Sequence, residues 1–89
     1  MKAIVIDHCC AAEELHVTEL PIPAAREGWV VVKIHAAGLN HSECLLRQFE
    51  ADQPHINTPV VPGIECVGEV WQTAAGSRFQ VGDRVVALM

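Results

Sequence analysis

The sequence predicts a mainly β fold, a small and partly open β-barrel that carries one short helix. Two observations predict it. Most apolar residues fall in short runs with a period of two, the spacing of strands, and residues typical of turns separate these runs. Apolar residues at helical spacing occur in one place only, in and directly after residues 40–48. With 89 residues, we expect a single domain over residues 1–89.

The strands are bounded by turn residues that are easy to place. The expected strands are residues 1–7, 14–20, 29–37, 65–73 and 84–89. A Pro-Ile-Pro segment at 21–23 ends the second strand, because proline cannot donate a hydrogen bond to a ladder. The third strand is the clearest, since β-branched residues dominate it. Its side chains expected to face inward are Val30, Val32, Ile34 and Ala36.

The one expected helix runs from Asn40 to Gln48. Asn40 is a good N-cap, and Glu43 stands three residues on, where its carboxylate can reach back to the backbone N–H of the cap. The apolar stripe of this helix consists of Leu45, Leu46 and Phe49. A loop with several prolines then leads to residue 62.

Composition excludes some classes of function. The net charge is −5 and the six Lys and Arg residues are scattered, whereas a nucleic-acid partner requires a clustered basic face. No apolar run approaches the roughly 20 residues that cross a bilayer, and residues 1–7 are too short for a secretion signal. The four cysteines form no Cys-x-x-Cys pair, and without a recognisable signal peptide we expect them to be reduced and the protein to be cytoplasmic. Cys44 and Cys66 are expected to be buried and inert.

Three motifs resemble those of a known family. Residues 38–43 read Gly-Leu-Asn-His-Ser-Glu, residues 62–68 read Pro-Gly-Ile-Glu-Cys-Val-Gly, and residues 81–85 read Val-Gly-Asp-Arg-Val. Together they resemble the N-terminal GroES-like domain of the medium-chain dehydrogenase/reductase superfamily, whose zinc-type alcohol dehydrogenases bind zinc through a Cys and a His. Asn40 and Ile64 occupy those positions here, and neither is a good zinc ligand. The sequence therefore resembles the zinc-independent quinone oxidoreductase branch.

The resemblance implies an oxidoreductase that transfers a hydride between the nicotinamide of NAD(P)H and a quinone, carbonyl or alkene substrate. In the family a Rossmann domain holds the cofactor, and no Gly-x-Gly-x-x-Gly turn occurs in this sequence. We therefore expect the chain to be a fragment of a longer enzyme and to be inactive without the missing Rossmann domain. A homo-oligomer without zinc is expected, with no nucleic acid or membrane as partner.

The resemblance also assigns roles to particular residues. It places Asn40 and His41 at the cofactor and makes His41 and Ser42 the catalytic candidates, with no metal ligand. Each has a simpler alternative: Asn40 can be only an N-cap, His41 a solvated side chain, and Ser42 a hydroxyl at a helix start. Glu65 survives from the family's Gly-His-Glu motif. Because a buried carboxylate is costly unless paired, we expect Glu65 to form an ion pair with Arg47 or Arg84.

Two alternatives stay open. The chain could be a non-catalytic GroES-like binding or assembly module, or a fragment of a zinc-dependent alcohol dehydrogenase with an unusual ligand set. A Gly-rich Rossmann turn in the reading frame beyond Met89 would favour the enzyme, and a stop codon there would favour the module. The apolar run at 85–89 is expected to leave an exposed strand edge that docks a further domain or pairs with another copy.

Overall fold

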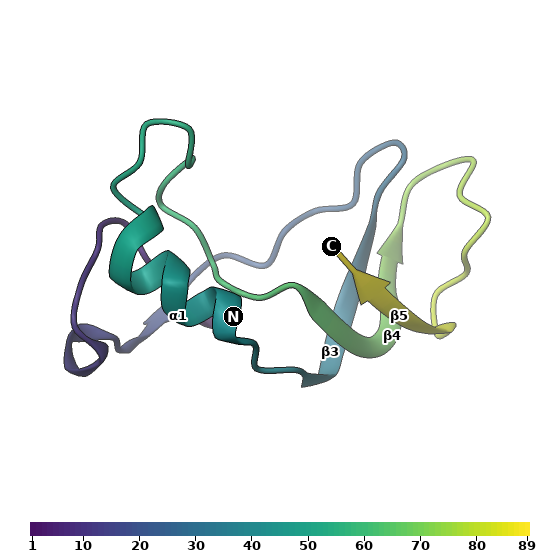
Figure 1. Cartoon of the computed structure of the whole chain (residues 1–89). Helices are drawn as coiled ribbons and strands as arrows, with labels where there is room; N and C mark the ends of the chain where they lie inside the picture. The colour runs from purple at the N-terminus through teal and green to yellow at the C-terminus, as the bar shows by residue number, and fades with distance from the viewer. The chain divides into compact units, whose positions relative to one another are not determined.

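Five strands and one short helical segment make up the computed structural model, which describes residues 1–89 (Figure 1). The strands are β1 (Lys2–Ile4), β2 (Val17–Glu19), β3 (Val30–Ala37), β4 (Glu65–Thr73) and β5 (Arg84–Leu88). Helix α1 (His41–Leu45) continues into a π-helical turn, η2 (Leu46–Glu50), and a 3₁₀ turn, η1 (Ala12–Glu14), precedes β2. The predicted mainly β fold with one short helix is confirmed, and its two sheets do not close into a complete barrel.

The chain forms two compact units, and each is described by itself. The first unit consists of Met1–Pro21 and Leu39–Gly63, and contains β1, β2 and the helical segment. The second unit consists of Ile22–Gly38 and Ile64–Met89, and contains the other three strands.

The first unit is built around a two-stranded sheet. β1 and β2 are antiparallel, with Lys2 opposite Glu19. Both strands are shorter than predicted, because the chain leaves this ladder after Ile4 and Ile6 pairs with Val60 instead. Ile6 and Val60 exchange two backbone hydrogen bonds of 2.9 Å each. Ile6 is buried, as is Ala51 after the helical segment, and these two side chains form the core of the unit.

The helix begins where the sequence predicts but ends differently. Asn40 is the N-cap of α1, as expected, and the helical path continues to Glu50 through the π-helical turn, in which the N–H of Ala51 donates to the carbonyl of Leu46 at 3.0 Å. The carbonyl of Arg47 in this turn accepts a hydrogen bond of 3.1 Å from the N–H of Cys10. The Arg47 guanidinium also donates to the carbonyl of Cys10 at 2.8 Å. The wider turn thus ties the helical segment to the N-terminal loop.

The second unit is a three-stranded antiparallel sheet with β4 between β3 and β5. β4 has the predicted bounds, and its Val70 is the most deeply buried side chain. The predicted alternation along β3 is wrong, since Ile34 is 58% exposed and Ala36 is exposed as well. The register of β3 against β4 shifts at two irregularities, one on each side of Ile34. An extra residue in one strand re-aims the side chains near it, and a period of two in the sequence cannot show this.

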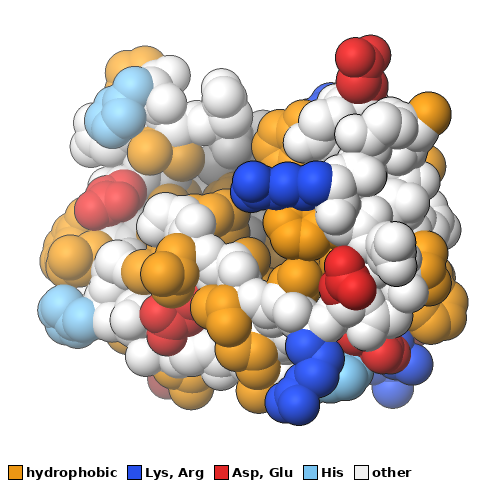
Figure 2. Space-filling model, turned by 90° about the vertical axis from the view of Figure 1, so that its right-hand side faces the viewer, with side chains coloured by type: hydrophobic (Ala, Val, Ile, Leu, Met, Phe, Trp, Pro, Cys, Tyr) orange, Lys and Arg blue, Asp and Glu red, His pale blue; other side chains and the backbone are white.

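Strand β5 leaves apolar side chains on the surface, as the sequence predicts for the edge strand. It pairs with β4 alone, and Val86 and Leu88 are 69% and 76% exposed. Figure 2 shows hydrophobic side chains exposed at several places on the surface, among scattered charged groups. No helix in the structure combines the length and the apolar character needed to span a bilayer.

Candidate functional site

The sequence motif at residues 38–43 forms the turn that enters α1. Asn40 has an extended backbone, with φ −125° and ψ 150°, and the helix starts at the next residue. Its N–H donates to the Oε2 atom of Glu43 at 3.1 Å, while the N–H of Glu43 donates to the Asn40 carbonyl at 3.1 Å. These reciprocal bonds satisfy donors that a helix start otherwise leaves unpaired. The backbone that carries Asn40 is therefore fixed by Glu43.

Two polar side-chain atoms at this turn are buried and have no hydrogen-bond partner. They are the Nδ2 atom of Asn40 and the Oε1 atom of Glu43. A buried polar group without a partner costs about 1–3 kcal/mol, so proteins rarely keep one without a use. The Asn40 amide is therefore a donor that a bound ligand with an acceptor oxygen could satisfy.

The other two candidates lie beside Asn40 but point to solvent. His41 and Ser42 are the first two residues of α1, and both are exposed. The structure thus brings Asn40, His41 and Ser42 together on a single turn, with one buried amide and two accessible polar groups.

Glu65 belongs to the second unit, and its surroundings differ from those we expected. It is the first residue of β4 and is half-buried. The predicted ion pair is wrong, because Arg47 donates to a backbone carbonyl and Arg84 lies opposite Glu69 in the sheet. Glu65 instead lies against Gly38, where a Cβ atom would overlap its carboxylate. The only signal for this contact in the sequence was a glycine directly after a strand.

The cysteines are less buried than expected. All four are free, Cys66 is only half-buried, and Cys44 is exposed, so the prediction of burial is wrong for both. Cys44 faces solvent because the neighbouring Leu45 and Leu46 take the more buried positions of this short helix. No three His, Cys, Asp or Glu side chains lie close enough together to hold a metal ion.

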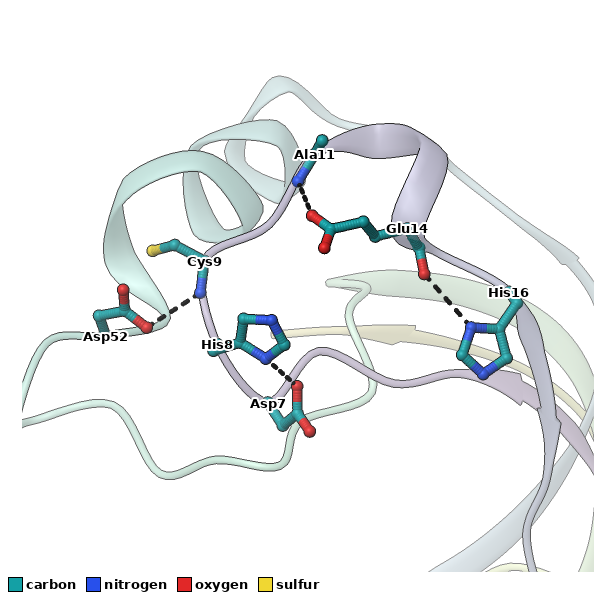
Figure 3. A network of polar contacts seen from close by, with 7 residues as sticks. All are labelled: Asp7, His8, Cys9, Ala11, Glu14, His16 and Asp52. Carbon is teal, nitrogen blue, oxygen red and sulfur yellow. Dashed lines mark hydrogen bonds and ion pairs between the residues drawn. The ribbon is translucent and has the colours of Figure 1, made fainter.

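A second polar network lies in the N-terminal loop of the first unit (Figure 3). Its side chains mostly bond to backbone: Asp52 accepts from the N–H of Cys9 at 2.9 Å, and Glu14 accepts from the N–H of Ala11 at 2.7 Å. His16 completes it with a contact of 3.2 Å from Nδ1 to the carbonyl of Glu14. Such bonds fix the path of a loop, so this network is structural.

Comparison with known proteins decides the family. The family model for the alcohol dehydrogenase GroES-like domain matches residues 26–89. The chain belongs to this family. It is the N-terminal GroES-like domain of the medium-chain dehydrogenase/reductase superfamily, as its three motifs predicted.

Its relatives include proteins of different names. The synaptic vesicle membrane protein VAT-1 homolog-like of Mus musculus is 31% identical over the whole chain, and acryloyl-coenzyme A reductase of Metallosphaera sedula is 34% identical, also over the whole chain. The chain spans 21% of the first relative and 26% of the second. The relatives named as reductases or dehydrogenases place the family among the oxidoreductases.

Solved structures share the fold. The quinone oxidoreductase of Coxiella burnetii matches 99% of this chain with 28% identity and a TM-score of 0.86, and the match covers 29% of that protein. A mycobacterial protein complexed with NADPH matches 97% of this chain with 28% identity and a TM-score of 0.77, covering 27% of that protein. The family therefore includes a quinone oxidoreductase and a protein that binds NADPH.

Proposed function

We propose that this chain is the substrate-side part of an NAD(P)H-dependent oxidoreductase that transfers a hydride to a quinone or to an activated carbonyl or alkene. One observation carries the proposal beyond family membership: the buried Nδ2 atom of Asn40 has no partner, and it lies in the motif that resembles the quinone oxidoreductase branch. A ligand acceptor at that point would remove the cost of the unpaired donor.

Asn40 and His41 would hold the cofactor. A change of the Asn40 side-chain rotamer that exposes its buried Nδ2 atom would let the amide donate to an oxygen of the nicotinamide end, while the backbone stays fixed by Glu43. The exposed ring of His41 can donate to a phosphate or a ribose hydroxyl. The nicotinamide supplies the hydride when it is bound, and this chain supplies orientation and polar contacts.

His41 and Ser42 would carry the proton that the reduced substrate needs. A quinone or carbonyl that has accepted a hydride must also gain a proton on oxygen. Both side chains are exposed at the start of α1, so the His41 imidazole can bind a proton and release it to the substrate oxygen, while the Ser42 hydroxyl can relay a proton by donating its own hydrogen as it accepts another.

The enzyme would work without a catalytic zinc. An amide at Asn40 and an alkyl side chain at Ile64 replace the thiolate and imidazole that zinc prefers. We further propose that the complete protein contains a Rossmann domain, assembles as a homo-oligomer and is cytoplasmic, and that the 89-residue chain is inactive by itself. The partial coverage of the relatives, 21% and 26%, supports the first of these points.

A variant of Asn40 separates its two roles. Serine is as good an N-cap as asparagine, but its short hydroxyl cannot present a donor where Nδ2 lies. In the complete enzyme, Asn40→Ser should leave the melting temperature nearly unchanged and raise KM for the cofactor about fivefold, the equivalent of one neutral hydrogen bond of about 1 kcal/mol. Asn57→Ser, in an exposed loop, is the matched control. Equal cofactor KM values for both variants and the wild type would show that Asn40 does not contact the cofactor and serves only as the N-cap of α1.

A further inference from the structure

The second unit contains a cavity that the proposed function does not use. It has a volume of about 480 Å³ and is lined by the turn before β3 (residues 27–30) and the loop after β4 (residues 74–79). The two segments adjoin because Val30 lies opposite Thr73 in the sheet. Its size falls within the roughly 300–1,000 Å³ typical of small-molecule sites. It shares no residue with the turn at α1.

Two of the residues that line the cavity are glycines in tight turns. Gly28 and Gly76 both have φ of +81°, a backbone conformation that residues with a side chain rarely adopt. A Cβ atom built on either would meet nothing within 4 Å, so open space lies beside both. The cavity is therefore a consequence of two tight turns at one end of the sheet.

The residues that line the cavity include two aromatic side chains and one arginine without an ion-pair partner. Trp29 is 62% exposed, which is unusual for so large an apolar side chain, and Phe79 is half-buried. The Arg78 guanidinium stacks over the Phe79 ring, with Cζ 5.2 Å from the ring centroid, and forms no ion pair. Stacking holds the plane of a guanidinium and leaves its N–H edge free for a carboxylate.

A neutral donor lies next to this cation. The Oγ atom of Ser77 accepts a hydrogen bond of 3.1 Å from the N–H of Phe79, which leaves the hydroxyl hydrogen free to donate. Arg26 does not line the cavity, and its Cζ lies over one face of the Trp29 ring, 4.7 Å from the ring centroid.

We propose that this cavity binds a planar aromatic monocarboxylate. The ring would pack on Trp29, and the carboxylate would pair with Arg78 and accept from Ser77. A single negative charge fits better than the two of a phosphate, because Glu27 also lines the cavity and repels additional negative charge.

Calorimetric titration of the 89-residue protein with 1-naphthoate tests the proposal. Submillimolar saturable binding is expected, with Arg78→Gln weakening it by about tenfold or more, as loss of a charge-assisted hydrogen bond does. Arg84→Gln removes the same charge from β5, outside the cavity, and should bind as the wild type does. The neutral analogue 1-naphthalenemethanol should bind at least about tenfold more weakly than the acid, because it cannot pair with Arg78.

A second readout locates the ligand. In ¹H–¹⁵N spectra, 1-naphthoate should shift the indole signal of Trp29 and leave that of Trp71 in place, with Trp71→Phe assigning the two signals. Absence of saturable binding, equal weakening by both arginine variants, equal affinity for the neutral analogue, or a shift of Trp71 alone would each overturn the proposal. Tighter binding of 1-naphthyl phosphate than of 1-naphthoate would show that the chemical class is wrong.

Discussion

The carboxylate of Glu65 lies against the Cα of Gly38, so closely that no side chain fits between them. Gly38 directly follows β3 and Glu65 begins β4, one position beyond the paired residues Ala37 and Cys66. The φ of Gly38 is not in the left-handed region, so its backbone alone would accept alanine. The Glu65 carboxylate, and not a turn, therefore occupies the space that a side chain at residue 38 would need.

The first prediction follows from this contact. The effect of Gly38→Ala on the free energy of unfolding should be less favourable in the wild type than in a Glu65→Ala background, with a coupling free energy of about 1 kcal/mol, as is usual for residues in contact. In the Glu65→Ala background, the alanine only reduces the conformational entropy of the unfolded chain. Gly38→Ala should then stabilise the folded protein by about 0.4–1 kcal/mol. Urea unfolding of the four proteins measures the cycle. The same effect of Gly38→Ala in both backgrounds would show that the contact carries no energy.

Glu43 is predicted to stabilise the start of α1 through the N–H of Asn40. Glu43→Ala should lower the free energy of unfolding by about 1 kcal/mol, as loss of a helix cap does, and Glu43→Gln should retain most of it because the amide oxygen still accepts. Glu50→Ala, at the exposed far end of η2, is the control and should change stability by less than about 0.5 kcal/mol. Equal losses for Glu43→Ala and Glu50→Ala would rule out a capping role.

Arg47 is predicted to tie the helical segment to the N-terminal loop. Its guanidinium donates to the carbonyl of Cys10, and the half-buried bond is charge-assisted. Arg47→Met keeps the apolar stem and removes the donor, so it should cost about 1.5–3 kcal/mol of stability. Arg84→Met, on the exposed side of β5, is the matched control. A thermal midpoint of Arg47→Met equal to that of the control would contradict this role.

How far the sequence predicts the structure depends on the kind of interaction. β4 was predicted to the residue and the start of α1 to within one residue, because both follow from local signals: a short apolar segment between a proline-rich loop and a turn, and an N-cap with Glu43 three positions later. The alternation of exposed and buried side chains along β3 was not predicted correctly. The irregularities on either side of Ile34 arise from the pairing of β3 with β4, and the local sequence pattern does not indicate them.

The candidate site shows the same division. A helix start with Asn40 as its N-cap was predicted, and α1 begins directly after Asn40. The expected ion pair of Glu65 was wrong because Arg47 is engaged by Cys10, 37 positions away in the sequence. A contact of that kind depends on the path of a loop, which no motif in the sequence records.

Strand β5 is predicted to drive self-association of the 89-residue chain. Val86 and Leu88 are exposed, and the outer backbone of the strand has no partner strand. Val86→Lys should therefore shift the sedimentation profile towards monomer, because a charged side chain on an edge strand opposes pairing. Val81→Lys changes an equally exposed valine in the preceding loop and should have no such effect. A wild-type chain that is monomeric at millimolar concentration would refute the prediction.

The most direct test of the proposed function is the rate of NADPH oxidation with 1,4-benzoquinone by the complete protein encoded by the gene, measured before and after exhaustive dialysis against a chelator. Without the thiolate and imidazole at Asn40 and Ile64, a catalytic zinc has too few ligands, so the rate should be the same in both samples. Loss of activity on dialysis, with recovery when Zn²⁺ is added, would contradict the zinc-independent mechanism. No NADPH oxidation with the quinone or with an activated carbonyl or alkene, in either sample, would contradict the proposed reaction itself.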